Sequence, residues 1–343
     1  MNGKYKKFPV GIKYLICVIF SAAAIILGIG IGSVFISPDE IAAVLANKIF
    51  GIDLPEKVTD ITAAIIMNVR LPRVLCAFIV GAGLSAGGAV MQSVLSNPLA
   101  SGYTLGVSSG ASLGVTLTVF FGITFFGAFT LPLMGFIFGF ATVLTAVAAA
   151  SRFDRNTGSA TIILIGMVMS LFVNAAVTLL MGINRDAAKS VIYWQMGSFS
   201  GQDLTTAAII FPITLVTILI VMRYSIAMDL MTFGDEQAMS AGVNIKSAKI
   251  LLLILSSALT GTAVAFVGTI GFIDLIAPHA VRKVFGSRHK IVIPMSAVTG
   301  GGFMVISDLL ARTVIAPVEL PVGAVTAIIG APVFAYIFLK KRK

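Results

Sequence analysis

The chain has 343 residues, of which 58% are hydrophobic and only 11% are charged, whereas an ordinary soluble domain has about 25% charged residues. With a mean hydropathy of +1.04, this composition excludes a soluble globular protein. The formal net charge of +10 does not by itself indicate nucleic acid, because Lys and Arg gather in the cytoplasmic loops of membrane proteins. We therefore predict an all-α, polytopic membrane protein.

Apolar runs recur along the chain with lengths near the roughly 20 residues that span a bilayer as a helix. The break between the seventh and eighth runs is the least marked, since residues 268–271 are the only turn signal there. The runs predict about ten transmembrane helices, beginning near Gly11, Arg70, Ser101, Leu131, Ala160, Leu204, Ile250, Gly271, Ile291 and Pro321.

Three polar segments between these helices are too long to be plain turns. Residues 38–50 predict a short amphipathic helix at the membrane surface, capped by Ser37 before a proline. Residues 183–203 carry Tyr193 and Trp194, which suit the membrane interface. Residues 223–249 predict short amphipathic helices broken by glycines, and such helices need a partner surface.

The distribution of Lys and Arg over alternate loops predicts the orientation. If both termini are cytoplasmic, most basic residues lie inside, as the positive-inside rule requires. The basic residues left outside are Lys48, Lys57, Arg70, Arg73, Arg185, Lys189 and Arg312.

Few side chains in this sequence could perform chemistry. No Walker A pattern occurs, so ATP hydrolysis in the P-loop manner would need a separate protein. Asp308 and Arg312 are four residues apart on one helix, close enough to pair. Asp274 has no obvious partner, and His289, which lies among basic residues, is expected to be a solvated loop histidine.

Arg70, Arg73 and Arg312 lie at helix ends on the side where positive charge is disfavoured. Arginine pairs well with carboxylates, so an acidic protein that docks from outside would explain them. Anchoring to lipid headgroups is the alternative.

Several sequence blocks, in order, resemble the signature of the FecCD family. This family comprises permease subunits of ATP-binding-cassette (ABC) importers for ferric siderophores, haem and cobalamin. The resemblance extends from about residue 37 to the C-terminus. Its blocks are Arg70-Leu71-Pro72-Arg73, Gly81-Ala82-Gly83-Leu84, Gln92, Asn97-Pro98-Leu99-Ala100, Leu105-Gly106-Val107-Ser108-Ser109-Gly110-Ala111, Pro278-His279 with Arg282 and Gly286, and Glu319-Leu320-Pro321-Val322-Gly323 through Thr326 to Gly330-Ala331-Pro332.

The resemblance implies the fold of a type II ABC importer permease, with residues 1–343 as a single transmembrane permease domain. It implies a second permease subunit, as a homodimer or heterodimer with the translocation path at the interface. It also implies ABC ATPase subunits on the cytoplasmic side and an extracytoplasmic substrate-binding protein. It implies no catalytic residue, metal or cofactor in the permease itself.

Family members use three sets of residues that can be carried over to this sequence. Arginines matching Arg70, Arg73 and Arg312 pair with glutamates of the binding protein. The loop matching residues 229–243, here named the coupling segment, forms coupling helices that seat in a groove of the ATPase. The family pattern of that segment is matched at Gly234, Glu236, Ala238 and Gly242.

The resemblance places the cytoplasmic gate at Asn97, Leu99 and Ser159. An Asn-Pro pair ends a helix, and small polar residues can close a constriction without a permanent charge. The sequence departs from the family at Ser96, where Arg is usual, and at Asp274, where Gly is usual. Asp274 is left without an assigned role.

The sequence thus predicts a non-enzymatic transporter subunit in a bacterial cytoplasmic (inner) membrane. ATP hydrolysis in the partner would move the coupling segment and open the path. A ferric siderophore is the first expectation for the cargo, with haem and cobalamin as alternatives. An ion-coupled secondary carrier is the rival, motivated by Asp274, Asp308 and the glycine-rich helices.

Overall fold

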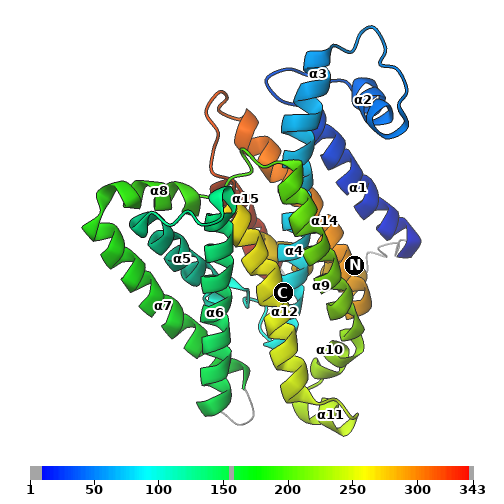
Figure 1. Cartoon of the computed structure of the whole chain (residues 1–343). Helices are drawn as coiled ribbons and strands as arrows, with labels where there is room; N and C mark the ends of the chain where they lie inside the picture. The colour runs from blue at the N-terminus through cyan, green and yellow to red at the C-terminus, as the bar shows by residue number, and fades with distance from the viewer. Residues whose placement is uncertain (1–9, 154–157, 340–343) are drawn as a thin grey trace.

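The computed structural model describes residues 10–153 and 158–339, and within them the secondary structure is helical throughout. Ten helices form the body of the described chain, and they match the ten predicted helices in order (Figure 1). They are α1 (Val10–Gly30), α4 (Leu71–Val94), α5 (Val107–Phe121), α6 (Thr130–Phe153), α7 (Ser159–Ile183), α9 (Leu204–Arg223), α12 (Ile245–Val267), α13 (Ile273–Phe285), α14 (His289–Thr313) and α15 (Val322–Leu339).

In the described residues, seven helical stretches are long and apolar enough to cross a membrane, while α5 and α15 are shorter apolar helices. The second stretch begins earlier than expected. Arg70 does not start it, because α3 (Asp60–Ile65) and a π-helical turn, η1 (Ile66–Arg70), continue directly into α4 and give a stretch of 35 residues. These stretches agree with the multi-pass membrane protein predicted from composition.

Helix α4 forms the centre of the bundle. It packs against α14, α12, α13 and α9, and almost all of its side chains are buried. Small residues make this possible, because helix backbones in a membrane approach closely where side chains are small. At Gly88 the approach is closest, since a Cβ atom there would overlap the carbonyl oxygen of Asp274 in α13.

Short helices lie at both ends of the bundle. At one end are α2 (Pro38–Phe50), whose N-terminus carries a capping box between Ser37 and Glu40, and α8 (Arg185–Gln195) (Figure 1). The surface helix predicted at 38–50 is therefore present, whereas α8 was not predicted as a helix. At the opposite end are α10 (Ser225–Met231) and α11 (Asp235–Ser240).

The chain leaves helical structure between α12 and α13, as residues 268–271 predict. Tyr103, in the short 3-10 helix η2 (Tyr103–Leu105), contacts this break. Its hydroxyl donates to the carbonyl oxygen of Ile270 at 2.7 Å and accepts from the backbone N–H of the same residue at 3.2 Å. With 13 residues, α13 is about 20 Å long and shorter than the hydrocarbon core of a bilayer, about 30 Å.

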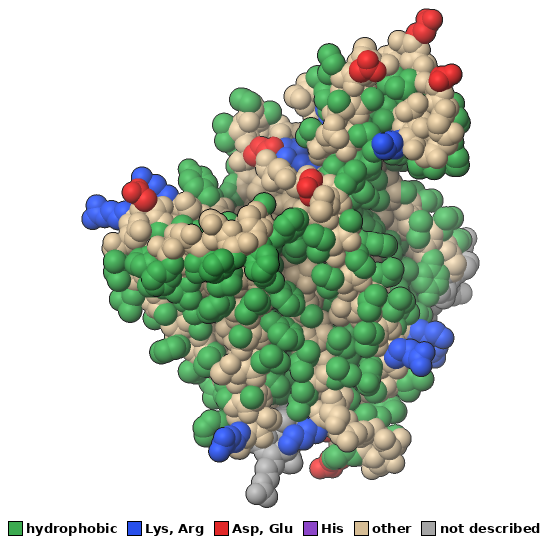
Figure 2. Space-filling model, in the orientation of Figure 1, with side chains coloured by type: hydrophobic (Ala, Val, Ile, Leu, Met, Phe, Trp, Pro, Cys, Tyr) green, Lys and Arg blue, Asp and Glu red, His purple; other side chains and the backbone are tan. Residues whose placement is uncertain are grey.

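A broad band of hydrophobic side chains covers the visible face of the molecule, and most charged side chains gather at its two ends (Figure 2). This arrangement agrees with a bilayer around the middle of the bundle. Many basic residues that predict the orientation lie outside the described residues. These are Lys4, Lys6, Lys7, Arg155, Lys340, Lys341, Arg342 and Lys343.

Candidate functional site

The coupling segment folds as two short helices, α10 and α11, joined through Gly234. Gly234 has φ +116° and Gly242, after α11, has φ +88°, conformations that L side chains rarely adopt. Both glycines therefore allow sharp turns at the two ends of α11.

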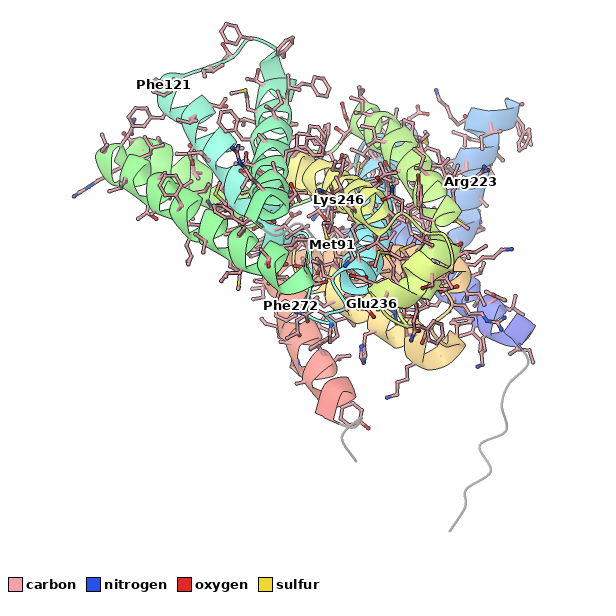
Figure 3. All side chains as sticks on the ribbon, turned by 90° about the horizontal axis from the view of Figure 1, so that it is seen from below. Met91, Phe121, Arg223, Glu236, Lys246 and Phe272 are labelled. Carbon is pink, nitrogen blue, oxygen red and sulfur yellow. The ribbon has the colours of Figure 1, made fainter. Side chains whose placement is uncertain are left out.

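One side of the coupling segment is buried and the other is exposed. Ala238 packs with Met231, Ile245 and Ala248 in a small hydrophobic cluster. Glu236 is exposed. It lies near the middle of the view from the end of the molecule that carries α10 and α11 (Figure 3). The coupling segment thus has an exposed side that carries Glu236 and a buried side that packs through Ala238.

The predicted gate residues lie at two helix ends next to this segment. After α4 the chain turns at residues 95–100, here named the gate turn, where the side chain of Asn97 accepts a hydrogen bond from the backbone N–H of Leu99 at 2.9 Å. Leu99 is 51% exposed. Ser159 is the first residue of α7.

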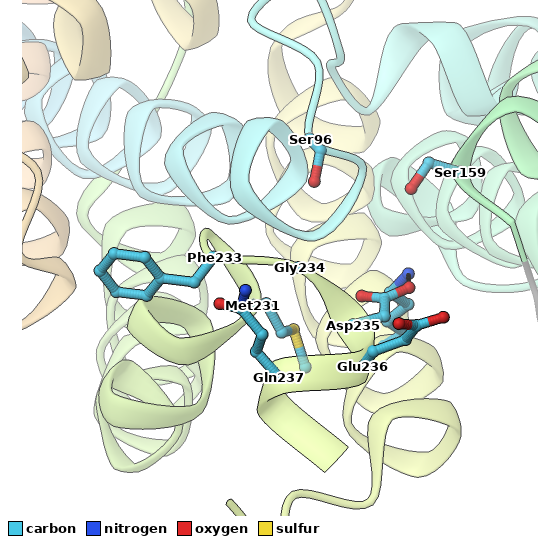
Figure 4. A pocket seen from close by; sticks show the side chains of 9 residues that line it. Ser96, Ser159, Met231, Phe233, Gly234, Asp235, Glu236 and Gln237 are labelled. Carbon is cyan, nitrogen blue, oxygen red and sulfur yellow. Dashed lines mark hydrogen bonds and ion pairs between the residues drawn. The ribbon is translucent and has the colours of Figure 1, made fainter. Parts of the chain in front are cut away.

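A pocket of about 390 Å³ lies between the coupling segment and Ser159, whereas Asn97 and Leu99 do not line it. Its lining includes Ser96 of the gate turn, Ser159, and residues 233–237 of the coupling segment. In the close view, Ser96 and Ser159 lie on one side of the pocket and Asp235 and Glu236 on the other (Figure 4). A displacement of α11 would therefore change the space next to Ser96 and Ser159.

Two buried basic residues hold the coupling segment to the bundle, and the sequence did not reveal either role. Lys249 of α12 forms an ion pair with Asp235, Nζ to Oδ2 at 2.5 Å. His289 of α14 lies with Nδ1 at 2.6 Å from Oδ1 of Asp229. His289 is 1% exposed, so the expectation of a solvated loop histidine was wrong.

The arginine clusters lie at the other end of the bundle. Arg73 is 7% exposed and donates to Asp308 from Nε and Nη2, at 2.9–3.0 Å. Its Nη1 donates to Glu319 at 2.7 Å. The predicted Asp308–Arg312 pair is present, with Nε of Arg312 at 3.7 Å from Oδ2.

Arg70 and Arg312 also bond inside the protein. Arg70 is 4% exposed and donates to the carbonyl oxygens of Ile29 and Gly30 at 2.8 and 2.9 Å. Arg312 donates to the carbonyl oxygen of Gly28. The structure therefore brings Arg73 and Arg312 together, because both contact Asp308. It places the side chain of Arg70 at the C-terminal end of α1.

Asp274 lies in the first turn of α13 and is 1% exposed. Its backbone carbonyl accepts a hydrogen bond from Nε2 of Gln92 at 3.1 Å. Over the described ranges, no Lys, Arg or His side chain forms an ion pair with its carboxylate. The same part of the chain holds no group of three His, Cys, Asp or Glu side chains placed to bind a metal ion.

Comparisons with known proteins agree with this geometry. The profile of the FecCD transport family matches residues 18–340. The ABC transporter permease protein YvrB of Bacillus subtilis is 37% identical over 344 residues, covering 100% of this chain and 96% of YvrB. The hemin transport system permease protein HmuU of Yersinia pestis is 36% identical, over 81% of this chain and 84% of HmuU.

A solved structure, described as an inward-facing conformation of a metal-chelate type ABC transporter, has the same fold. Its TM-score is 0.83 at 30% sequence identity, and the match covers 96% of this chain and 99% of that chain. The family profile, YvrB and the solved structure each match nearly the whole length of this chain, and all three agree with the family that the sequence motifs predicted. The chain therefore belongs to the FecCD transport family, as a multi-pass membrane permease of an ABC importer.

Proposed function

We propose that this permease forms the translocation path for a metal complex, and that a ferric siderophore is the first cargo to test. The observation that carries the proposal is the pocket in which the coupling segment faces Ser96 and Ser159. A subunit that receives movement from a separate ATPase needs its receiving surface next to its gate. The pocket provides that neighbourhood.

The proposal includes the partners and the orientation. An ABC ATPase pair binds the exposed side of the coupling segment around Glu236, and a second permease subunit completes the path. The coupling segment and both termini face the cytoplasm of a bacterial cell, across its cytoplasmic membrane. Substrate arrives from an extracytoplasmic binding protein at the end that carries α2 and α8.

Docking of the binding protein through Arg70, Arg73 and Arg312 belongs to the same proposal. Because their guanidinium groups bond internally, docking requires that they exchange or share partners with glutamates of the binding protein. Arg312→Glu is expected to abolish association, measured by surface plasmon resonance. Arg185→Glu, at an exposed position on α8, is the control, and thermal unfolding of both variants separates lost docking from lost folding. Undiminished affinity would contradict this role.

The relatives of this chain differ in the cargo for which they are named. They include permeases for hemin, Fe(3+)-citrate, cobalamin and molybdate. The assay for this chain therefore needs a panel: radioactive iron as several siderophores, as citrate and as haem, with labelled cobalamin and molybdate beside them. Cells with and without the gene are compared. Loss of uptake of one compound identifies the cargo.

The ion-coupled carrier predicts a different outcome. Uptake that persists when the partner ATPase is inactivated, but collapses with the ion gradient, would refute the ATP-driven proposal. Membership of an ABC permease family favours ATP-driven import. The engagement of Asp308 with Arg73 also removes one of the acids that motivated an ion-coupled carrier.

A further inference from the structure

The two halves of the coupling segment are fastened to different membrane helices. Asp229 of α10 accepts from both the backbone N–H of His289, at 2.9 Å, and its ring Nδ1, at 2.6 Å. Asp235 of α11 accepts from Nζ of Lys249 at 2.5 Å. Thus α10 is joined to α14, and α11 is joined to α12.

Both joints have the same asymmetry. The basic side chains are buried, with 3% of the Lys249 side chain and 1% of the His289 side chain exposed. The acidic partners are partly exposed, 42% for Asp235 and 34% for Asp229. If the segment moved away alone, a buried Lys249 charge would lose its partner, which is strongly unfavourable. Each half of the segment is therefore expected to move together with its helix.

Gly234 lies between the two joints. It has φ +116° and nothing within 4 Å of the position that a Cβ atom would occupy. The backbone there has the freedom and the space to change its angles. A change of the backbone angles at Gly234 would therefore change the orientation of α10 relative to α11.

Both α12 and α14 contact the helix that ends at the gate turn. Helices α12 and α14 pack against α4, and the gate turn follows the end of α4. In addition, Lys249 itself lines the pocket with Ser96 and Ser159. Movement of the α11–α12 unit would reach the gate through this wall of the pocket.

We propose that Asp235–Lys249 and Asp229–His289 are the positioning joints through which movement of the coupling segment reaches α12 and α14. This inference rests on the proposed function of the segment, and it goes further by naming the helices that receive the movement and the residues that transmit it. The joints keep contact throughout the transport cycle, while the backbone around Gly234 bends.

A reversible cross-link tests the first joint. In a Cys17→Ser/Cys76→Ala background, Asp235→Cys/Lys249→Cys removes the ion pair, and a short bis-methanethiosulfonate linker restores a connection that reductant removes. The permease is reconstituted with its ATPase and binding protein in liposomes. Without the linker, cargo imported per ATP is expected to fall by about tenfold, within the usual range of coupling between distant sites. With the linker, it should return to near the native ratio.

Either of two results would overturn the inference. Native import per ATP without the linker would mean that the joint transmits nothing. Loss of the remaining import on linking, with recovery in reductant, would mean that α11 and α12 must separate. Asp186→Cys/Lys189→Cys is the matched control, because this exposed pair lies on α8 at the other end, and linking it should change nothing.

A second variant covers a folding failure of the cysteine pair. Asp235→Asn/Lys249→Met leaves no charge at the joint, so it is expected to fold, as its thermal unfolding would show, with the same loss of import per ATP. Native coupling in this variant would also overturn the inference. The proposed function fails in a different way, when the native complex hydrolyses ATP but imports no compound of the panel.

Discussion

Replacing Arg73 by methionine tests whether the buried acid–base network between α4 and α14 stabilises the fold. The variant leaves the carboxylate of Asp308, 1% exposed, without its hydrogen bonds from Arg73. Only the longer contact from Arg312, at 3.7 Å, remains near it. Removing one partner of a buried ion pair costs about 3–5 kcal/mol, so we expect the free energy of unfolding of Arg73→Met to fall by about that amount.

A double-mutant cycle separates this network from general packing. Arg73→Met/Asp308→Leu has no carboxylate at position 308. It should therefore lose much less stability than the single variant, with a coupling energy of at least about 2 kcal/mol. The assay is reversible unfolding in mixed micelles, followed by circular dichroism. The exposed pair Asp186–Lys189 is the control, since exposed pairs contribute about 1 kcal/mol or less. Effects at positions 73 and 308 that add within about 0.5 kcal/mol would refute the reasoning.

Three further predictions concern packing, helix capping and coupling. Gly88→Ala should strongly lower the melting temperature because its Cβ would overlap the backbone of α13, whereas Gly271→Ala, with open space around it, should not; equal melting temperatures would contradict the close approach. Asp203 caps α9. Hydrogen bonds that its carboxylate accepts from the backbone and side chain of Thr206 lower the pKa of Asp203. Its stabilising contribution, about 1 kcal/mol for a cap, is therefore present above the unfolded pKa of about 3.9 and is lost as pH falls through the lower folded pKa. The stability difference between native protein and Asp203→Ala, measured by denaturant titration, should shrink below pH 4, and a difference independent of pH would count against the charged cap. Glu236→Ala and Gly242→Val should reduce import per ATP while ATP hydrolysis continues, measured in liposomes; unchanged import would exclude a role in coupling.

The sequence predicted the order of the membrane helices well, because long apolar runs carry that information directly. Two of its errors occur where a charged side chain lies inside a helix; in addition, the third helix begins at Val107, not near Ser101, and α8 was not predicted. Arg70 was taken as the start of the second helix, but its side chain bonds to carbonyl groups at the end of α1 and the helix continues through it. The seventh helix begins at Ile245, not near Ile250, because Lys249 pairs with Asp235 and can lie in the helix.

The candidate site was also predicted only in part from the sequence. Motifs located the coupling segment and the gate turn, and one pocket is lined by residues 233–237 of the segment and by Ser96 of the turn. Charge patterning could not reveal the joints, because Asp229 and His289 are sixty residues apart and a histidine in a basic stretch has no local sign of burial. It also could not reveal that Arg70 and Arg73 are buried, since their partners come from distant helices.

Tyr103 bonds to the backbone of the connection between α12 and α13. A buried backbone N–H or C=O needs a hydrogen-bond partner, and one phenol oxygen serves both groups of the buried Ile270. The hydroxyl acts there as a built-in substitute for a water molecule. A phenylalanine at position 103 would fill nearly the same volume and yet remove both partners at once. The connection between α12 and α13 therefore depends on that single oxygen atom for both backbone groups of Ile270.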